Sequence, residues 1–282
     1  MELNSIFYIS KKELLDNVRN KWVIIITIIF TALTLLASYA GSIFSSGWQD
    51  LGGTISSMTA LVQYLISIIA LILGYSAIIG EIEKGSMSSL LSLPTTRTEI
   101  LIGKFLGLGS ILTLSIIIGF GLAGLIIGFN VPNVNYGEYF FFILASILMA
   151  LIFLSIGLFL STVFKKRSTA MGSAIFIWVF FAIIWLFIVA AIIVASNTIS
   201  DIESGGEFRL PDAYYASNFF NPISSYSQLL QLNIGSLSGN SVEQFGFETP
   251  DFISNASMTL SMFIWLFSFL FLAYFAFKRK DI

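Results

Sequence analysis

Two residue types that carry much of protein chemistry are missing from this sequence, which contains no cysteine and no histidine. Without cysteine the chain cannot form a disulfide, bind a metal through a thiolate or use a cysteine nucleophile. Without histidine it lacks the commonest metal ligand and general base. Most catalytic templates are therefore excluded, and we expect no catalytic residues, no metal site and no cofactor.

Charge is also scarce. Only 11% of the 282 residues are charged, whereas 56% are hydrophobic. An ordinary soluble domain carries roughly 25% charged residues, so this composition indicates a membrane protein. The net charge of −2 says little, because in a membrane protein the placement of charge along the chain is more informative than its total.

Long charge-free runs are what the sequence offers instead. A bilayer core about 30 Å thick requires about 20 consecutive apolar residues in a helix. Runs of this length without Asp, Glu, Lys or Arg extend over residues 23–44, 59–80, 105–129, 139–164, 169–196 and 257–277. We therefore expect an all-α integral membrane protein in which six transmembrane helices form a single domain over residues 1–282.

The basic residues predict the orientation of these spans. Thirteen of the 14 Lys and Arg residues lie at the termini or in the second and fourth connections, and only Arg209 lies elsewhere. Basic residues concentrate on the cytoplasmic side of membrane proteins. The pattern predicts a cell-membrane protein with both termini in the cytoplasm.

Two segments outside the spans are expected to form structure. Residues 1–22 place apolar side chains between charges, which predicts a helix in the cytoplasmic interface, with a disordered basic tail as the alternative. Residues 197–256 are expected outside the cell and are too long for a turn. Within them, residues 221–232 predict a proline-initiated amphipathic helix on the membrane face.

The third predicted span contains Gly124 and Gly128. Small residues four positions apart let two helices approach closely in a membrane. We therefore expect a packing seam within the bundle in preference to a substrate feature.

The most specific segment is the predicted cytoplasmic connection at residues 81–104. It combines two carboxylates, a glycine bend, a short half-apolar helix, a proline stop and a cation, after which a helix restarts near Thr98. The residues in question are Glu81, Glu83, Gly85, Met87, Leu90, Leu91, Pro94 and Arg97. An exposed helix that is half apolar is expected to bind a partner surface.

Specific roles follow for these side chains. Met87, Leu90 and Leu91 are expected to enter an apolar groove on the partner. Glu81 and Glu83 are expected to cap the short helix or to pair with Lys84, Arg97 or a partner arginine, unless they are simply solvated charges at the membrane surface.

Residues 81–104 match the pattern Glu-x-Glu-x-Gly-Ser/Thr-x-x-x-Leu-Leu-Ser-x-Pro-x-x-Arg-x-x-x-x-x-Gly-Lys. In this pattern the chain resembles permease subunits of ABC-2 type exporters, particularly the group that includes the permease of nitrous-oxide-reductase maturation systems. The resemblance extends to the six spans, to Lys12-Glu13-Leu14 and to Asn221-Pro222. It implies that two permease copies pair with two ATP-binding subunits, and that residues 81–104 dock into the ATPase as a coupling helix.

ATP hydrolysis must then come from the partner. Gly103-Lys104 is not part of a phosphate-binding loop, because Thr98 stands where the first glycine is required. The leading hypothesis is the permease subunit of an ATP-driven exporter, itself not an enzyme and without a nucleic-acid partner. The alternative is an ATP-independent channel, uniporter or membrane scaffold. An intramembrane enzyme is disfavoured because the spans contain no ionisable pair to perform chemistry.

Overall fold

The computed structural model describes residues 3–18, 28–29, 31–33, 35–36, 55, 58–87, 92, 94–130, 136–196, 210–234 and 249–280. These residues form helices and connections without a strand, which confirms the all-α prediction. Within the described residues, five helices are long and apolar enough to cross a membrane: Met58–Glu83, Arg97–Ile126, Tyr136–Val163, Arg167–Ala195 and Asn255–Arg279. They match the last five predicted spans. The first predicted span, residues 23–44, lies mostly outside the described residues.

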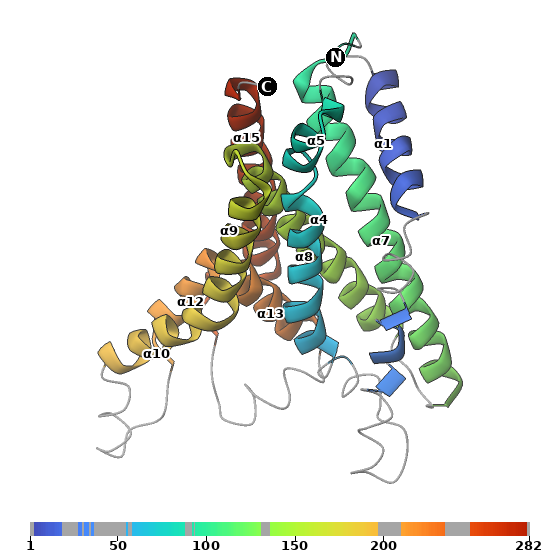
Figure 1. Cartoon of the computed structure of the whole chain (residues 1–282). Coiled ribbons are helices and arrows are strands. Elements are labelled where there is room, and N and C mark those ends of the chain that lie inside the picture. Colours follow the sequence, from blue (N-terminus) through green and yellow to red (C-terminus); the bar gives the residue numbers. More distant parts are fainter. Residues whose placement is uncertain are drawn as a thin grey trace, which may run out of the picture.

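The chain order of the helices is shown in Figure 1. The N-terminal part contains α1 (Leu3–Val18), the π-helical turn η1 (Val62–Ile66), α4 (Ser67–Tyr75) and α5 (Ile79–Glu83). The middle contains α7 (Arg97–Asn130), α8 (Tyr136–Val163), α9 (Arg167–Val179), the π-helical turn η2 (Phe180–Ile184) and α10 (Trp185–Ala195). The last part contains α12 (Asp212–Ser217), the 3₁₀ turn η3 (Asn218–Phe220), α13 (Pro222–Asn233) and α15 (Asn255–Arg279).

Helix α8 is the centre of the bundle and packs against α4, α7, α13 and α15. Its closest approach is to α4, where Gly74 faces Gly157. A Cβ atom added at Gly74 would lie 2.8 Å from the Leu154 carbonyl oxygen and 2.9 Å from the Gly157 Cα. Two backbones can approach this closely only where both lack side chains. In lipid the hydrophobic effect does not drive helices together, so close packing of this kind stabilises their association.

A turn separates α4 from α5 inside the second predicted span. The backbone N–H groups of Ile78 and Ile79 both donate to Ser161 Oγ of α8, each at 2.9 Å. An unpaired backbone N–H in a membrane is costly, so the Ser161 hydroxyl is what allows the helix to break here. The break sets the direction in which α5 leaves the bundle.

The glycine seam of α7 is confirmed as internal packing. A Cβ atom at Gly124 would overlap the ring of Tyr139, and one at Gly128 would lie 2.6 Å from the hydroxyl of Tyr136. Both tyrosines belong to α8, so the two glycines let the first turns of α8 lie against the end of α7.

The two π-helical turns have carbonyl groups that accept hydrogen bonds from other elements. Trp178 Nε1 donates to the carbonyl group of Tyr64, within η1, at 3.2 Å. It also donates to Ser67 Oγ, directly after η1, at 3.0 Å. Asn221 Nδ2 donates to the Phe181 carbonyl in η2 at 3.0 Å. A π-turn carries one extra residue and leaves its carbonyl groups less well paired, so these side chains stabilise both irregular turns.

The predicted helix at residues 221–232 is confirmed, with Asn221 as its N-cap and Pro222 in the first turn. It packs within the bundle, against α8 and α15, and its position at the membrane face stays a prediction. Tyr226 is 0% exposed, and its hydroxyl is 3.0 Å from Ser146 Oγ of α8. Ser146 follows the first residue of α8 by ten positions, so α13 reaches about 15 Å along α8. Ser146 and Tyr226 are both buried, and each hydroxyl group is the hydrogen-bond partner of the other. A helix on the surface would not need such a partner, because water is available there.

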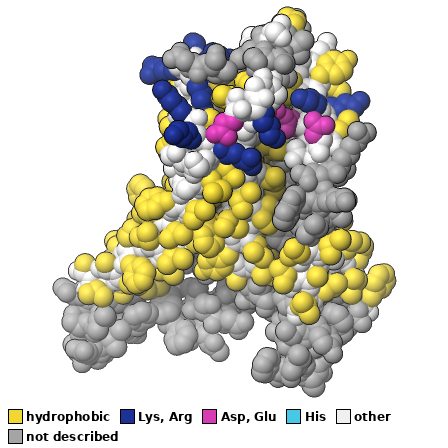
Figure 2. Space-filling view, in the orientation of Figure 1, with side chains coloured by type: hydrophobic (Ala, Val, Ile, Leu, Met, Phe, Trp, Pro, Cys, Tyr) yellow, Lys and Arg dark blue, Asp and Glu magenta, His cyan; other side chains and the backbone are white. Residues whose placement is uncertain are grey.

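Lysine and arginine side chains gather at one end of the molecule. Figure 2 shows them, together with acidic side chains, around the end of the bundle where the C-terminal end of α15 lies, above an apolar surface. Helix α1 and the described part of segment 81–104 also belong to this end, which we call the basic end.

Candidate functional site

The candidate site is the part of segment 81–104 that the structure describes, together with the helices that hold it. Gly85 provides the predicted bend, with φ of +73°. Side-chain-bearing residues rarely adopt this conformation. No atom lies within 4 Å of a Cβ added at Gly85, so glycine is required here by the backbone conformation and not by lack of space.

The segment returns to helix through a reciprocal pair of hydrogen bonds. The Thr96 backbone N–H donates to Glu99 Oε2 at 3.0 Å, and the Glu99 backbone N–H donates to Thr96 Oγ1 at 3.3 Å. This is a capping box, which satisfies N–H groups at a helix start. The predicted helix restart near Thr98 is confirmed, with α7 beginning at Arg97.

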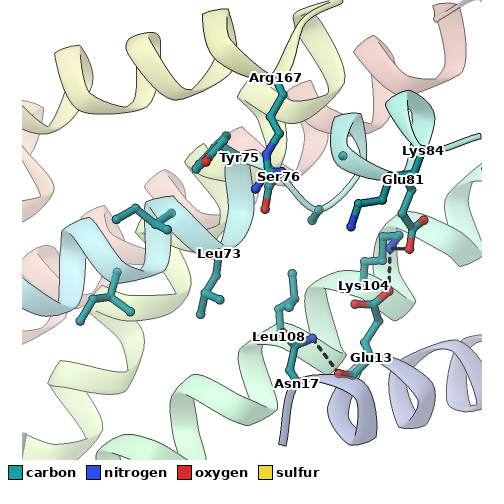
Figure 3. A pocket seen from close by; sticks show the side chains of 14 residues that line it. Glu13, Asn17, Leu73, Tyr75, Ser76, Glu81, Lys84, Lys104, Leu108 and Arg167 are labelled. Atoms are coloured by element: carbon teal, nitrogen blue, oxygen red, sulfur yellow. Dashed lines mark hydrogen bonds and ion pairs between the residues drawn. The ribbon is translucent and has the colours of Figure 1, made fainter. Parts of the chain in front are cut away.

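A buried ion cluster joins three elements at the basic end (Figure 3). Lys104 of α7 is 1% exposed, and its Nζ lies 2.6 Å from Glu13 Oε1 of α1 and 2.7 Å from Glu81 Oε1 of α5. A buried ammonium is tolerated only when it is paired and hydrogen-bonded. The cluster therefore fixes α1 and α5 to the same point on α7.

Two glycines of α7 allow α1 to lie close enough for this pairing. A Cβ atom at Gly103 would be 2.7 Å from the Ile9 side chain, and one at Gly107 would be 2.5 Å from the Glu13 Cβ. Gly103 and Gly107 thus form a second small-xxx-small seam, in which Gly103 directly precedes Lys104 and Gly107 follows it by about one turn.

Arg97 binds the C-terminal end of α15. Its Nη1 donates to the carbonyl groups of Phe277 at 2.8 Å, Lys278 at 3.1 Å and Lys280 at 2.7 Å. The last carbonyl groups of a helix lack intrahelical partners and carry partial negative charge. Arg97 therefore acts as a C-terminal cap for α15 and ties segment 81–104 to it.

Lys280 makes the equivalent contact to α8. Its Nζ donates to the carbonyl groups of Ser161 at 3.0 Å and Phe164 at 2.7 Å. Burial lowers the pKa of Lys280 to about 8, because the charged form loses water. Together with Arg97, this lysine links segment 81–104, α15 and α8 in one hydrogen-bonded series.

The partners of the two carboxylates differ from those predicted. Glu81 pairs with Lys104, and Glu83 accepts a hydrogen bond at 2.7 Å from the backbone N–H of Arg167 at the start of α9. Neither of these contacts involves Lys84 or Arg97. The prediction named Lys84, Arg97 or a partner arginine, whereas the folded chain brings α7 and the start of α9 to the two carboxylates.

Met87 is 0% exposed and packs in a cluster with Ile78, Ile100 and Phe277. In this arrangement its side chain is not available for a partner groove, which differs from the prediction for Met87. It anchors the segment to α7 and α15 instead. Pro94 is exposed, and residues 88–91, which include the predicted contacts Leu90 and Leu91, lie outside the described residues.

Lys104 and Glu13 were missed by reasoning from the sequence. Both stand in stretches that carry the family resemblance, Gly103-Lys104 and Lys12-Glu13-Leu14, and a lysine directly beside a charge-free run is a signal that could have found Lys104. The cluster offers ion pairs and hydrogen bonds only. Among the described residues there is no group of three or more Asp, Glu, His or Cys side chains that could hold a metal ion.

Comparison with known proteins identifies the protein family to which the chain belongs. Residues 7–282 match the family described as ABC-2 family transporter protein, and the chain belongs to this family. It is therefore a membrane-embedded permease subunit of an ABC transporter. Membership implies an ATP-binding partner and a membrane context.

Two individual relatives are similar over almost their whole length. A protein of Stutzerimonas stutzeri named "Probable ABC transporter permease protein NosY" is 33% identical, over 99% of both chains. A protein of Pseudomonas aeruginosa with the same name is 31% identical, over 98% of this chain and 99% of the relative. The family match over residues 7–282 includes the whole of segment 81–104 and both partners of Lys104.

Proposed function

We propose that this chain is the membrane-spanning subunit of an ATP-driven exporter, that it forms the translocation pathway, and that a separate ATP-binding subunit docks on segment 81–104. The observation that carries this proposal is the way the segment is held. Lys104, the last residue of the segment, pairs with Glu81 at its beginning and with Glu13 of α1. Arg97 binds the segment to the end of α15. A displacement of the segment by a partner is therefore passed directly to helices that cross the membrane.

Hydrolysis is assigned to the partner because the chain has no phosphate-binding loop. The proposed surface for that partner is Leu90 and Leu91, with Glu83 and Pro94 at its edges and Met87 as the anchor beneath. A half-apolar helix in a groove is a common form of recognition. Two ATP-binding subunits are expected, one on each permease.

A second permease copy is supported by the helix that contains α9, η2 and α10. Only 11% of its most apolar window is buried within the chain, compared with 67% for α8. Its exposed residues include Phe176, Leu186 and Phe187. We propose that part of this face packs on the second copy, because one bundle provides half of a pathway and one of two docking surfaces.

The basic end is proposed to face the cytoplasm, with both termini, in accord with the positive-inside rule. The ATP-binding subunit would then meet segment 81–104 where ATP is available. Helices α12 and α13, at the opposite end, would face the outside.

The test is Leu90→Asp in the full transporter. We expect the variant to lose ATPase association or transport-stimulated ATP hydrolysis while keeping its membrane fold and dimer, because burying an unpaired carboxylate in an apolar groove is costly. Ser92→Asp is the matched control, because Ser92 is exposed in the same segment and the change adds the same charge without removing an apolar group. Normal transport and normal ATPase binding by Leu90→Asp would remove the docking assignment.

The alternative remains an ATP-independent channel, uniporter or scaffold. Purification of the native complex separates the two, because the exporter requires an ATP-binding chain in stoichiometric amount. A permease that is purified with its ATPase and remains monomeric would contradict the proposed pairing of two copies.

A further inference from the structure

A cavity of about 620 Å³ lies at the basic end between α1, the α4–α5 helix pair, α7 and the start of α9. This volume is in the range of small-molecule binding sites. One half of its wall is apolar and consists of Ile69, Ile72, Leu73 and Leu108. The other half, nearer the basic end, carries the charged side chains of Glu13, Glu81, Lys84, Lys104 and Arg167. Figure 3 shows the labelled residues of the cavity around one open space.

The apolar half lies at the depth of the membrane-spanning helices. Ile69 precedes Ser76, the C-cap of α4, by seven residues, which places it about 10 Å further from the basic end. Ile72 is 50% exposed although it lies within a span. This wall is therefore accessible, and in a bilayer the groups that reach it are acyl chains. A ligand that fits has an apolar part toward the bilayer centre and a polar part at the basic end, as a phospholipid does.

The polar half holds two cations next to each other. Glu83 accepts a hydrogen bond from the backbone N–H of Arg167, which joins the end of α5 to the start of α9. Lys84 is the residue after Glu83, so it borders the same opening as Arg167. The Arg167 guanidinium lies 5.9 Å from the centre of the Tyr75 ring, a cation–π contact that orients its side chain. Figure 3 shows Lys84 and Arg167 both directed into the cavity.

The charges that line the cavity are not balanced. Lys104 is paired with both carboxylates, whereas among the described residues Lys84 and Arg167 make no ion pair. The lining as a whole has three cations and two carboxylates, which leaves one positive charge in excess. A headgroup whose only charge is its phosphate restores neutrality, whereas a zwitterionic headgroup brings a further cation to the unpaired cations. Basic pockets between transmembrane helices bind anionic lipid headgroups in this way.

We propose that the cavity binds an anionic phospholipid of the phosphatidylglycerol class. Its phosphate lies between Lys84 and Arg167, and an acyl chain follows the apolar half along Ile69 and Ile72. A free phosphate ion offers the same charge but leaves the apolar half unused. This proposal does not depend on the direction of transport or on the identity of the ATPase.

The test measures the thermal stability of the purified full-length protein in micelles of an uncharged detergent. Phosphatidylglycerol, phosphatidylcholine and diacylglycerol with the same acyl chains are added separately, and inorganic phosphate is added as a fourth arm at the same concentrations. We expect phosphatidylglycerol to raise the unfolding temperature at about tenfold lower concentration than phosphatidylcholine, because each basic residue beside an anionic lipid contributes about 1 kcal/mol, close to a tenfold change in affinity. Diacylglycerol and inorganic phosphate should give no shift, because each fills only one half of the cavity.

Variants identify the residues. K84Q/R167Q should lose the preference for phosphatidylglycerol over phosphatidylcholine. K165Q/K166Q is the matched control and should keep it, because Lys165 and Lys166 are exposed beside Arg167 and carry the same charge but do not line the cavity. K84Q alone leaves Arg167 on Tyr75 and should give an intermediate preference, so the effect is measurable even where the double variant is unstable. Mass spectrometry of copurified lipid provides a second measurement that does not depend on stability.

Several results would overturn the assignment. An equal effect of phosphatidylglycerol and phosphatidylcholine on the unaltered protein would do so, as would an undiminished preference in both K84Q and K84Q/R167Q. Loss of the preference in K165Q/K166Q would show that the basic end attracts anionic lipid in general and that the cavity does not select it. A full effect of inorganic phosphate would identify a free anion and exclude a lipid.

Discussion

Removing the charge of Lys104 is the most direct perturbation of the candidate site. Lys104→Met keeps a long unbranched side chain and deletes the ammonium group. The carboxylates of Glu13 and Glu81, with side chains 13% and 22% exposed, would then face the same site without a cation. Breaking a buried ion pair from one side costs about 3 to 5 kcal/mol. Because both carboxylates keep some contact with solvent, we expect a loss near the lower limit, about 3 kcal/mol.

Two further variants separate charge from packing. Glu13→Gln removes one carboxylate but leaves the pair between Lys104 and Glu81, so we expect a smaller loss of about 1 kcal/mol. The triple variant K104M/E13Q/E81Q leaves no uncompensated charge and is expected to recover most of the stability, because neutral replacement of a buried cluster is often tolerated. Recovery in the triple variant is the outcome that a simple packing defect cannot produce.

The assay is unfolding of the purified protein in detergent, combined with limited proteolysis of α1. A loss of about 3 kcal/mol corresponds to a fall in unfolding temperature of roughly 6 to 12 °C for a chain of this size. Faster cleavage within α1 should accompany it, because Lys104 holds this helix on α7. A change below about 1 kcal/mol for Lys104→Met, or a triple variant no more stable than the single one, would refute the reasoning.

Three other predictions concern the seam, the pH dependence and the topology. Gly107→Ala should destabilise the protein by about 1 to 2 kcal/mol through overlap with Glu13, measured by denaturation, whereas Gly121→Ala should not, because no atom lies within 4 Å of its added Cβ. The pKa of Lys280, lowered to about 8, makes the folded state release a proton before the unfolded state, so the free energy of unfolding should rise from pH 8 to 10, and Lys280→Met should abolish this rise. A cysteine at Ser204 should react with an impermeant label in intact cells; labelling only after permeabilisation would show that the topology is wrong.

The spans could be predicted because a membrane helix is specified locally. A charge-free run of sufficient length needs no knowledge of its neighbours, and the five described long helices agree with it. The bend at Gly85 and the N-cap at Asn221 were predictable for the same reason, since backbone conformation and capping depend on a few adjacent residues.

The ion cluster could not be predicted from these local rules. Glu13, Glu81 and Lys104 are far apart in sequence, and each alone resembles a charge at the edge of a span. The burial of Met87 is a similar case, because a methionine on a short amphipathic helix fits a partner groove and an internal cluster equally well. Only the packing of α1, α7 and α15 decides between these possibilities.

The π-helical turn η1 lets the second span contain one residue more than a regular helix of the same length. Its i→i+5 hydrogen bonds close a wider turn than those of an α-helix, so Val62–Ile66 takes up the extra residue in a local bulge, and the helix after it keeps the face that it presents to α8. The same bulge provides the Tyr64 carbonyl that accepts from Trp178 Nε1 of α9. The extra residue therefore adds an attachment point for α9 without turning α4 away from α8.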